Sequence, residues 1–232
     1  MENSGVAVAK VVAKVASVGV DESSNAFLHD CFKQFGIQVI PVKGEAPAIL
    51  GRQKFEGCVL RLYASDAEEI LKSARNSSSN RRMVIYGIAR NTQEALRFSS
   101  FGINAIFDEP LERQGVLRVV RSTHLLVIHE LRRYVRIPVV TEAAIDVGTG
   151  GRLVAASMEV SAGGMSVRSP KPVPSEEMVR ISFALPGEKP IKVRASVCWA
   201  RPGENLYGVR FDSSDAARLA VRRWIDQYLE LV

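Results

Sequence analysis

The hydrophobic positions of this chain change their spacing near residue 130. Before that point, short runs rich in β-branched residues alternate with segments in which apolar residues recur every three or four positions. The first pattern is typical of buried strands and the second of amphipathic helices. The expected strands are residues 14–20, 37–42, 58–63, 83–88 and 104–107, and the expected helices are 24–35, 65–75, 92–101 and 111–130. Such alternation predicts a parallel sheet with helices on both faces.

Residues that commonly cap helices stand at the start of two of these segments. Ser23 or Ser24 is expected to cap the first helix, because a serine side chain accepts hydrogen bonds from the free N–H groups of the first turn. Ser65 is followed three positions later by Glu68, a spacing that predicts a capping box at the second helix.

After residue 136 the helical spacing is absent until residue 214. Apolar and polar residues alternate instead, which is typical of half-buried strands. In the segment 191–199 the residues predicted to share one face are Ile191, Val193, Ala195, Val197 and Trp199. These short strands predict an antiparallel barrel or sandwich, closed by a helix over residues 214–231. We therefore expect an α/β domain over residues 1–127 and an all-β domain over residues 128–232.

The composition adds few constraints. The chain has 232 residues, of which 47% are hydrophobic and 24% charged, as in globular proteins. No apolar run approaches the roughly 18 residues that span a bilayer. The first residues carry Glu2 and lack the basic-then-apolar order of a secretion signal, so the cytoplasm is the expected location. Cys31, Cys58 and Cys198 are far apart, and we expect neither a disulfide framework nor a metal site.

Positive charge is concentrated where the spacing changes. The net charge is +6, and residues 113–136 are rich in arginine, including Arg132, Arg133 and Arg136. This charge favours an anionic partner. On charge alone, nucleic acid, an acidic membrane and a phosphorylated small molecule all remain open.

A second motif follows some twenty residues later, in the run Glu159-Val-Ser-Ala-Gly-Gly164. It offers the hydroxyl of Ser161 and two glycines, Gly163 and Gly164. Glycine allows the backbone to turn tightly and to come close to a ligand.

Together, R-x-x-x-R and the later acidic-x-S-x-x-G resemble the ligand site of PilZ domains, over about a hundred residues from Glu130 to the end. The segments Val197-Cys-Trp199 and Tyr207-Gly-Val-Arg-Phe211 extend this resemblance. It implies a six-stranded antiparallel β-barrel with a C-terminal helix that binds the bacterial second messenger cyclic di-GMP. The implied ligand-binding residues are Arg132, Arg133, Arg136, Glu159, Ser161, Gly163 and Gly164.

The chemistry of these residue types suits such a ligand. An arginine matches O6 and N7 of guanine, stacks on a purine and forms charge-assisted bonds to phosphate. Glu159 stands where the family usually has Asp or Asn, and it keeps the acceptor oxygens with one extra methylene. Leu131 stands where many relatives have another arginine, so we expect one nucleotide per chain rather than a stacked pair.

The α/β part resembles the receiver domain of response regulators, most clearly in residues 101–110. Transfer of phosphate to an aspartate is not expected. The strand at 58–63 contains no aspartate, and Glu109 replaces the lysine of the family. Asp21 and Glu22 are offset from the usual acidic pair and are interpreted as surface acids. The resemblance implies a pseudo-receiver that binds an unidentified protein partner, and a homodimer remains open.

These features predict a cytoplasmic bacterial signalling protein that binds cyclic di-GMP without a cofactor, a metal or catalysis. Nucleotide binding would change the interdomain arrangement or partner binding. The main alternative is a protein-interaction scaffold whose barrel binds no nucleotide. We expect no membrane insertion. Nucleic-acid binding is disfavoured because the sequence shows no helix-turn-helix and no row of aromatics. An enzyme is disfavoured because all three histidines lie outside the barrel segment, so none is near Ser161 in sequence to activate it.

Overall fold

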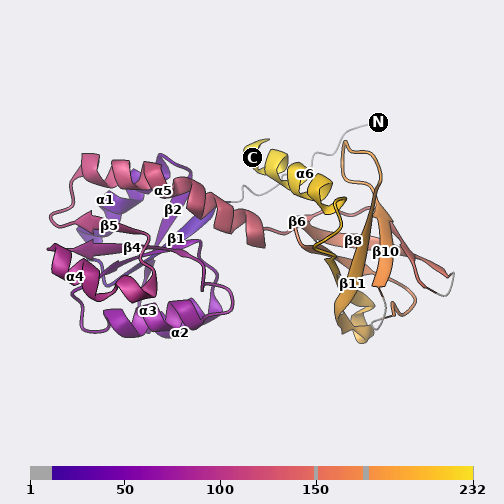
Figure 1. The fold of residues 1–232 in the computed structure, drawn as a ribbon, viewed down its shortest axis with the longest axis horizontal. Helices are drawn as coiled ribbons and strands as arrows, with labels where there is room; N and C mark the ends of the chain where they lie inside the picture. The colour runs from indigo at the N-terminus through magenta and orange to yellow at the C-terminus, as the bar shows by residue number, and fades with distance from the viewer. Residues whose placement is uncertain (1–11, 149–150, 175–177, 232) are drawn as a thin grey trace. The chain divides into compact units, whose positions relative to one another are not determined.

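The computed structural model describes residues 12–148, 151–174 and 178–231 (Figure 1). The beginning of the chain, considered above for a secretion signal, lies largely outside the described residues. The chain divides into two compact units, one from Val12 to Leu131 and one that includes all described residues from Arg132 onwards. Each unit has its own hydrophobic core.

The first unit is built on a five-stranded parallel sheet, which confirms the expected α/β fold. Its strands are β1 (Ala13–Val18), β2 (Ile37–Val42), β3 (Gly57–Arg61), β4 (Val84–Ala89) and β5 (Ala105–Asp108). Their order is β2-β1-β3-β4-β5, the order of flavodoxin-like folds. Every residue of β4 is buried, as a central strand covered on both faces requires.

Helices cover both faces of this sheet (Figure 1). One core cluster includes residues of α1 (Glu22–Lys33) and α5 (Arg113–Tyr134). The opposite cluster includes residues of α2 (Ala46–Arg52), α3 (Ala67–Asn76) and the short α4 (Thr92–Arg97). The sheet is therefore the middle layer of three, as its apolar strands predict.

The helix starts differ from the sequence predictions. The cap of α1 is Asp21, whose carboxylate accepts a hydrogen bond from the backbone N–H of Ser24. Neither serine caps the helix, because the aspartate before them reaches the same donors. The capping box of Ser65 and Glu68 does not form, since α3 begins after Asp66 without a side-chain cap. Helix α2 is an element that the hydrophobic spacing does not predict.

Tyr86 links the sheet to α5. Its ring stacks on Phe107 at 5.4 Å between centroids and meets Phe32 edge to face at 5.3 Å. Its hydroxyl lies 2.9 Å from Oγ1 of Thr123, which in turn donates to the carbonyl of Val119. The hydroxyl of Tyr86 therefore has a hydrogen-bond partner on α5, the helix that continues into the second unit.

The second unit is a closed antiparallel barrel, which confirms the expected all-β fold. Its strands are β7 (Glu142–Asp146), β8 (Arg152–Ser161), β9 (Gly164–Arg168), β10 (Met178–Phe183), β11 (Ile191–Arg201) and β12 (Leu206–Phe211). Pairing of β8 with β9 closes the ring, and the short β6 (Ile137–Pro138) pairs with the end of β8. Closure removes the free edges that an open sheet would expose.

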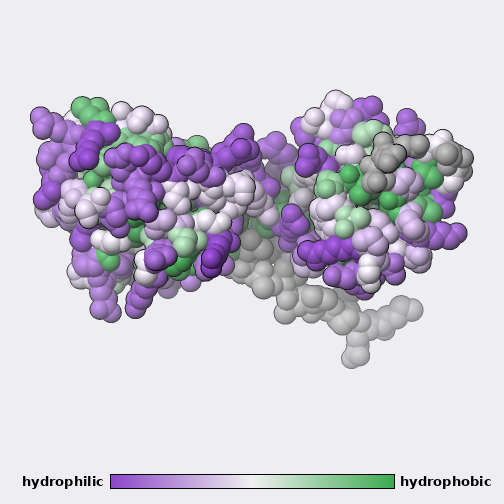
Figure 2. Space-filling model, turned by 90° about the horizontal axis from the view of Figure 1, so that it is seen from below, coloured by the Kyte–Doolittle hydropathy of each residue, from purple (hydrophilic) through white to green (hydrophobic). Residues whose placement is uncertain are grey.

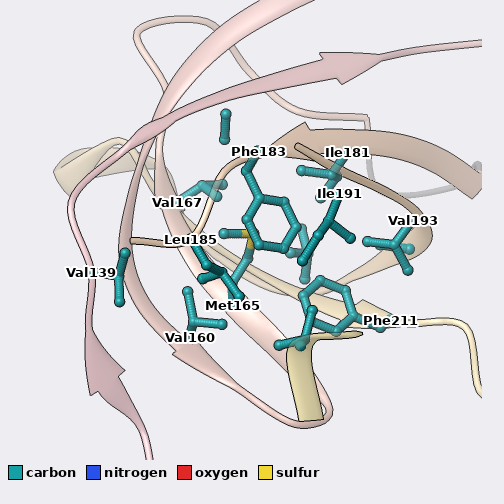
Figure 3. Packing of buried hydrophobic residues seen from close by; sticks show 14 of the residues in the cluster. Val139, Val160, Met165, Val167, Ile181, Phe183, Leu185, Ile191, Val193 and Phe211 are labelled. Carbon is teal, nitrogen blue, oxygen red and sulfur yellow. The ribbon is translucent and has the colours of Figure 1, made fainter. Parts of the chain in front are cut away.

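Inward-facing residues fill this barrel, as Figure 3 shows. Phe183 and Phe211 stack with centroids 6.0 Å apart. Helix α6 (Arg218–Leu231) packs on the same core through Val221 and Ile225. The barrel and its terminal helix thus share one core.

The outer surface mixes hydrophilic residues with separate apolar patches on the face shown in Figure 2. Within the described part of the chain, no helix is both long and apolar enough to traverse a bilayer.

A first prediction concerns Tyr86. Burial raises the pKa of Tyr86 to about 12, whereas tyrosine in an unfolded chain titrates near ~10. The stability contributed by the neutral phenol is therefore complete below pH ~10 and is lost as the pH rises to ~12, about 3 kcal/mol in all. Tyr86→Phe should cost about 1 kcal/mol at neutral pH and then lose less stability than the wild type above pH ~10.

Denaturant unfolding at a series of pH values would measure this difference. Burial also raises the pKa of Cys58 to about 12, but both proteins keep that thiol. Identical pH profiles for the two proteins would contradict the assignment.

Candidate functional site

A pocket of about 290 Å³ opens on the outer face of the barrel. It contains five of the seven residues that the sequence analysis names: Arg136, Glu159, Ser161, Gly163 and Gly164. The other lining residues are Met165, Ser166, Cys198, Trp199, Gly208, Val209 and Arg210. Arg136 and Ser161, which are far apart in sequence, thus share one site.

A bulge in β8 turns two of these side chains outward. The register with β9 shifts between Ser157 and Glu159, so Met158 is the extra residue. Ser157 is fully buried and donates to the carbonyl of Val139, whereas Glu159 is exposed. Without the extra residue, these two positions would face the same side. The bulge therefore directs Glu159, and Ser161 two residues later, to the outer face.

A second bulge does the same for Trp199, and it corrects the sequence prediction that this residue shares a face with Val197. The pairing with β12 shifts at Cys198, so that Val197 lies opposite Val209 and Trp199 lies opposite Gly208. Trp199 lines the pocket instead of the core, because one extra residue reverses the alternation.

Two glycines allow this packing. A Cβ on Gly164 would lie 2.1 Å from the backbone oxygen of Val209, and a Cβ on Gly208 would lie 2.0 Å from Nε1 of Trp199. Both contacts are far inside van der Waals distance. Nothing lies within 4 Å of a Cβ built on Gly163. The close approach thus requires glycine at 164 and 208, but not at 163.

The polar side chains of the pocket differ in whether they already have a partner within the protein. Ser161 donates its hydroxyl proton to the carbonyl of Gly164 at 2.9 Å, which closes the hairpin and leaves the serine oxygen as an acceptor. Arg136, Glu159 and Arg210 are exposed, and none takes part in an ion pair with the described residues. The pocket therefore presents two guanidinium groups, one carboxylate and an indole ring.

Arg132 and Arg133 do not line this pocket. Both stand in the last turn of α5, which extends past its predicted end at residue 130. Nε of Arg132 lies 3.4 Å from the carboxylate of Asp226 on α6. The guanidinium of Arg133 lies 5.7 Å from the ring centre of Tyr134. The structure thus brings only the second arginine of the R-x-x-x-R pair to the pocket.

The first unit carries a charged cluster at the carboxyl ends of its strands. Arg61, the last residue of β3, pairs with Asp21 after β1 and lies 3.6 Å from Glu109 after β5. Hydrogen bonds from Ser23 and Ser24, followed by that from Arg61, hold the pKa of Asp21 well below its ordinary value. Asp21 is therefore both a helix cap and a partner of Arg61.

This cluster is organised around a cation. The guanidinium of Arg61, at the carboxyl end of β3, contacts the carboxylates of Asp21 and Glu109. Across the described residues, no group of three His, Cys, Asp or Glu side chains is placed to hold a metal ion.

The fold and the pocket define a two-domain chain, with a receiver-like α/β unit and a barrel that carries a polar pocket. Residues 130–230 match the family model of the PilZ domain. The carboxy-terminal unit is therefore a PilZ domain. A comparison with curated proteins gave no match.

Solved structures resemble each unit separately. The chemotaxis response regulator CheY4 of Vibrio cholerae aligns at 15% identity and a TM-score of 0.43, covering 48% of this chain and 98% of that one. The PilZ domain of CeSA from a cellulose-synthesizing bacterium aligns at 18% identity and a TM-score of 0.34, covering 40% of this chain and 97% of that one. The inhibitor of motility MotI/DgrA of Bacillus subtilis aligns at 22% identity and a TM-score of 0.34, covering 41% of this chain and 50% of that one.

Sequence reasoning does not identify Trp199 and Arg210 as pocket residues. A signal for Arg210 is present, because it alternates with the inward-facing Val209 and Phe211 and so points outward. No such signal exists for Trp199, because strand alternation does not reveal a bulge.

The two glycines of the hairpin provide a matched test. Gly164→Ala should destabilise the barrel by about 1–3 kcal/mol or more, because the added methyl overlaps backbone. Gly163→Ala should change stability by about 0.5 kcal/mol at most, since the space there is open. Denaturant unfolding of the two variants would measure this, and equal effects would contradict the described approach of β9 and β12.

Proposed function

We propose that this chain is a cyclic di-GMP receptor of bacterial signalling, whose PilZ domain binds the nucleotide in the outer-face pocket. Membership of the carboxy-terminal unit in a family of cyclic di-GMP-binding effectors supports this proposal. The observation that carries it is the convergence of Arg136, Glu159 and Ser161 on one pocket.

The chemistry of the pocket suits a guanine nucleotide. The fork of Arg136 can hold O6 and N7 of guanine or a phosphodiester oxygen. The carboxylate of Glu159 can accept from N–H groups on the guanine edge, and the oxygen of Ser161 is a further acceptor. Trp199 provides a flat surface on which a purine can stack. Gly163 leaves open space for the ligand, since nothing lies within 4 Å of a Cβ built there.

We propose that Arg132 and Arg133 exchange contacts within the protein for contacts with the ligand. Arg132 lies next to Asp226, and the two side chains are 35% and 30% exposed. A phosphodiester would offer Arg132 an anionic partner in place of Asp226. Binding would then move the last turn of α5, the helix that continues from one unit into the other. Arg133 would add a phosphate contact from the same turn.

The receiver-like unit has a different proposed role. Its strand ends carry Arg61 between Asp21 and Glu109 rather than a phosphoacceptor. We therefore assign it no phosphotransfer and propose that it contacts a protein partner. The output of the chain would be a change in the arrangement of the units or in that partner's binding.

Binding itself is tested by calorimetry with cyclic di-GMP. We expect one nucleotide per chain, and Arg136→Ala should weaken binding about ten- to hundredfold, because hydrogen bonds to charged groups are the strong ones. Arg168→Ala removes an exposed arginine of β9 that does not line the pocket, and it should bind like the wild type. No heat with the wild type would support the scaffold alternative, and two nucleotides per chain would contradict the expected stoichiometry.

The proposed switch is tested by small-angle scattering of the full chain. Saturating cyclic di-GMP should change the distance distribution of the wild type, and the same concentration should leave that of Arg136→Ala closer to the unliganded profile. The change can be no larger than the ligand's preference for one arrangement allows. An unchanged wild-type profile at saturation would reject the switch without affecting the binding result.

A further inference from the structure

Arg210 stands on the opposite wall of the pocket from Arg136. It lies on β12 beside Gly208 and Val209, which also line the site. It is exposed, and neither sequence motif includes it.

The strand register places the two arginines in one row across neighbouring strands. The antiparallel pairing of β6 with β8, continued by one residue, sets Arg136 beside Ser161. Ser161 pairs with Gly164, and Gly164 pairs with Arg210. Along the curved sheet, three steps between adjacent strands separate the backbones of the two arginines by about 14 Å, and the direct distance is shorter.

Little side-chain bulk lies between these arginines. Of the two intervening residues, Gly164 has no side chain, and Ser161 has a small one whose hydroxyl is bonded to the hairpin carbonyl. Two long side chains can therefore reach over the same space from opposite sides. A ligand in that space would meet a guanidinium at each end.

The electrostatics of the barrel surface distinguish Arg136 and Arg210 from the three barrel arginines that form ion pairs. Neither has an ion pair with the described residues. Two cations and the single carboxylate of Glu159 leave the hollow positive, which favours an anion there. The barrel arginines that form ion pairs within the described residues are Arg152 (with Asp146), Arg194 (with Asp212) and Arg201 (with Glu204).

We propose that Arg210 is a second ligand-binding arginine, and that the pocket selects a ligand with two separated anionic groups. The inference rests on the proposed function. Cyclic di-GMP carries two phosphodiesters, and Arg136 and Arg210 would each hold one. Arg210 thus supplies a cation from β12, whereas Arg132 lies next to Asp226 and outside the pocket lining.

Calorimetry with cyclic di-GMP tests this role in the full chain. Arg210→Ala should weaken binding about ten- to hundredfold, Arg210→Lys less, and the control Arg168→Ala not at all. The double variant of Arg136→Ala and Arg210→Ala should lose about the product of the two single losses, because the arginines hold different anions. Equal thermal unfolding of the variants would show that all are folded.

Three results would overturn the inference. Arg210→Ala binding like Arg168→Ala, while Arg136→Ala is impaired, would exclude Arg210 as a contact and leave the proposed function intact. A double variant no weaker than Arg136→Ala would mean that the two arginines do not hold separate anions. A wild type that binds no cyclic di-GMP would remove both the inference and the proposed function.

Discussion

The close approach of β9 and β12 at Gly164 is the constraint on which the candidate site depends. A side chain there would overlap the backbone of Val209, so the two strands could not keep their present pairing. The same strands complete the barrel, because β9 joins β12 to β8. Ser161 then holds the hairpin closed by donating to the Gly164 carbonyl. The contact at Gly164 thus belongs both to the pairing that closes the barrel and to the pocket.

Much of the fold could be predicted from hydrophobic spacing, since each strand of the first sheet is apolar and bounded by polar turns. Helix α2 could not be predicted in this way. Pro47 and Gly51 lie within it, and these residue types usually indicate a loop. A proline at the first turn of a helix is nevertheless compatible with it. The predicted direction of Trp199 is wrong for a physical reason. Its position depends on an inserted residue in β11, and an alternating pattern cannot show which residue is unpaired.

In the candidate site, too, features within short segments could be predicted, whereas contacts between distant segments could not. The motif residues could be named because their chemistry is local to short segments. It could not be predicted that Arg132 lies outside the pocket, since this depends on its contact with Asp226, which is distant in sequence. In the receiver-like unit, the absence of an aspartate from residues 58–63 is evident in the sequence. That Arg61 joins two acids from other loops depends on how parallel strands align their ends.

In the proposed switch, the pair of Arg132 and Asp226 would determine how ligand binding moves α5. Both side chains are partly exposed, and solvent-accessible ion pairs contribute only about 0–1 kcal/mol. Under the proposed function, a charge-assisted bond from Arg132 to a phosphodiester would contribute about 1.5–3 kcal/mol where the bound nucleotide shields it from water. Exchange of the carboxylate for the ligand would be favourable to the extent that this shielding exceeds that of the present pair. Because the arginine belongs to the last turn of α5, that difference sets the free energy available to reposition the helix.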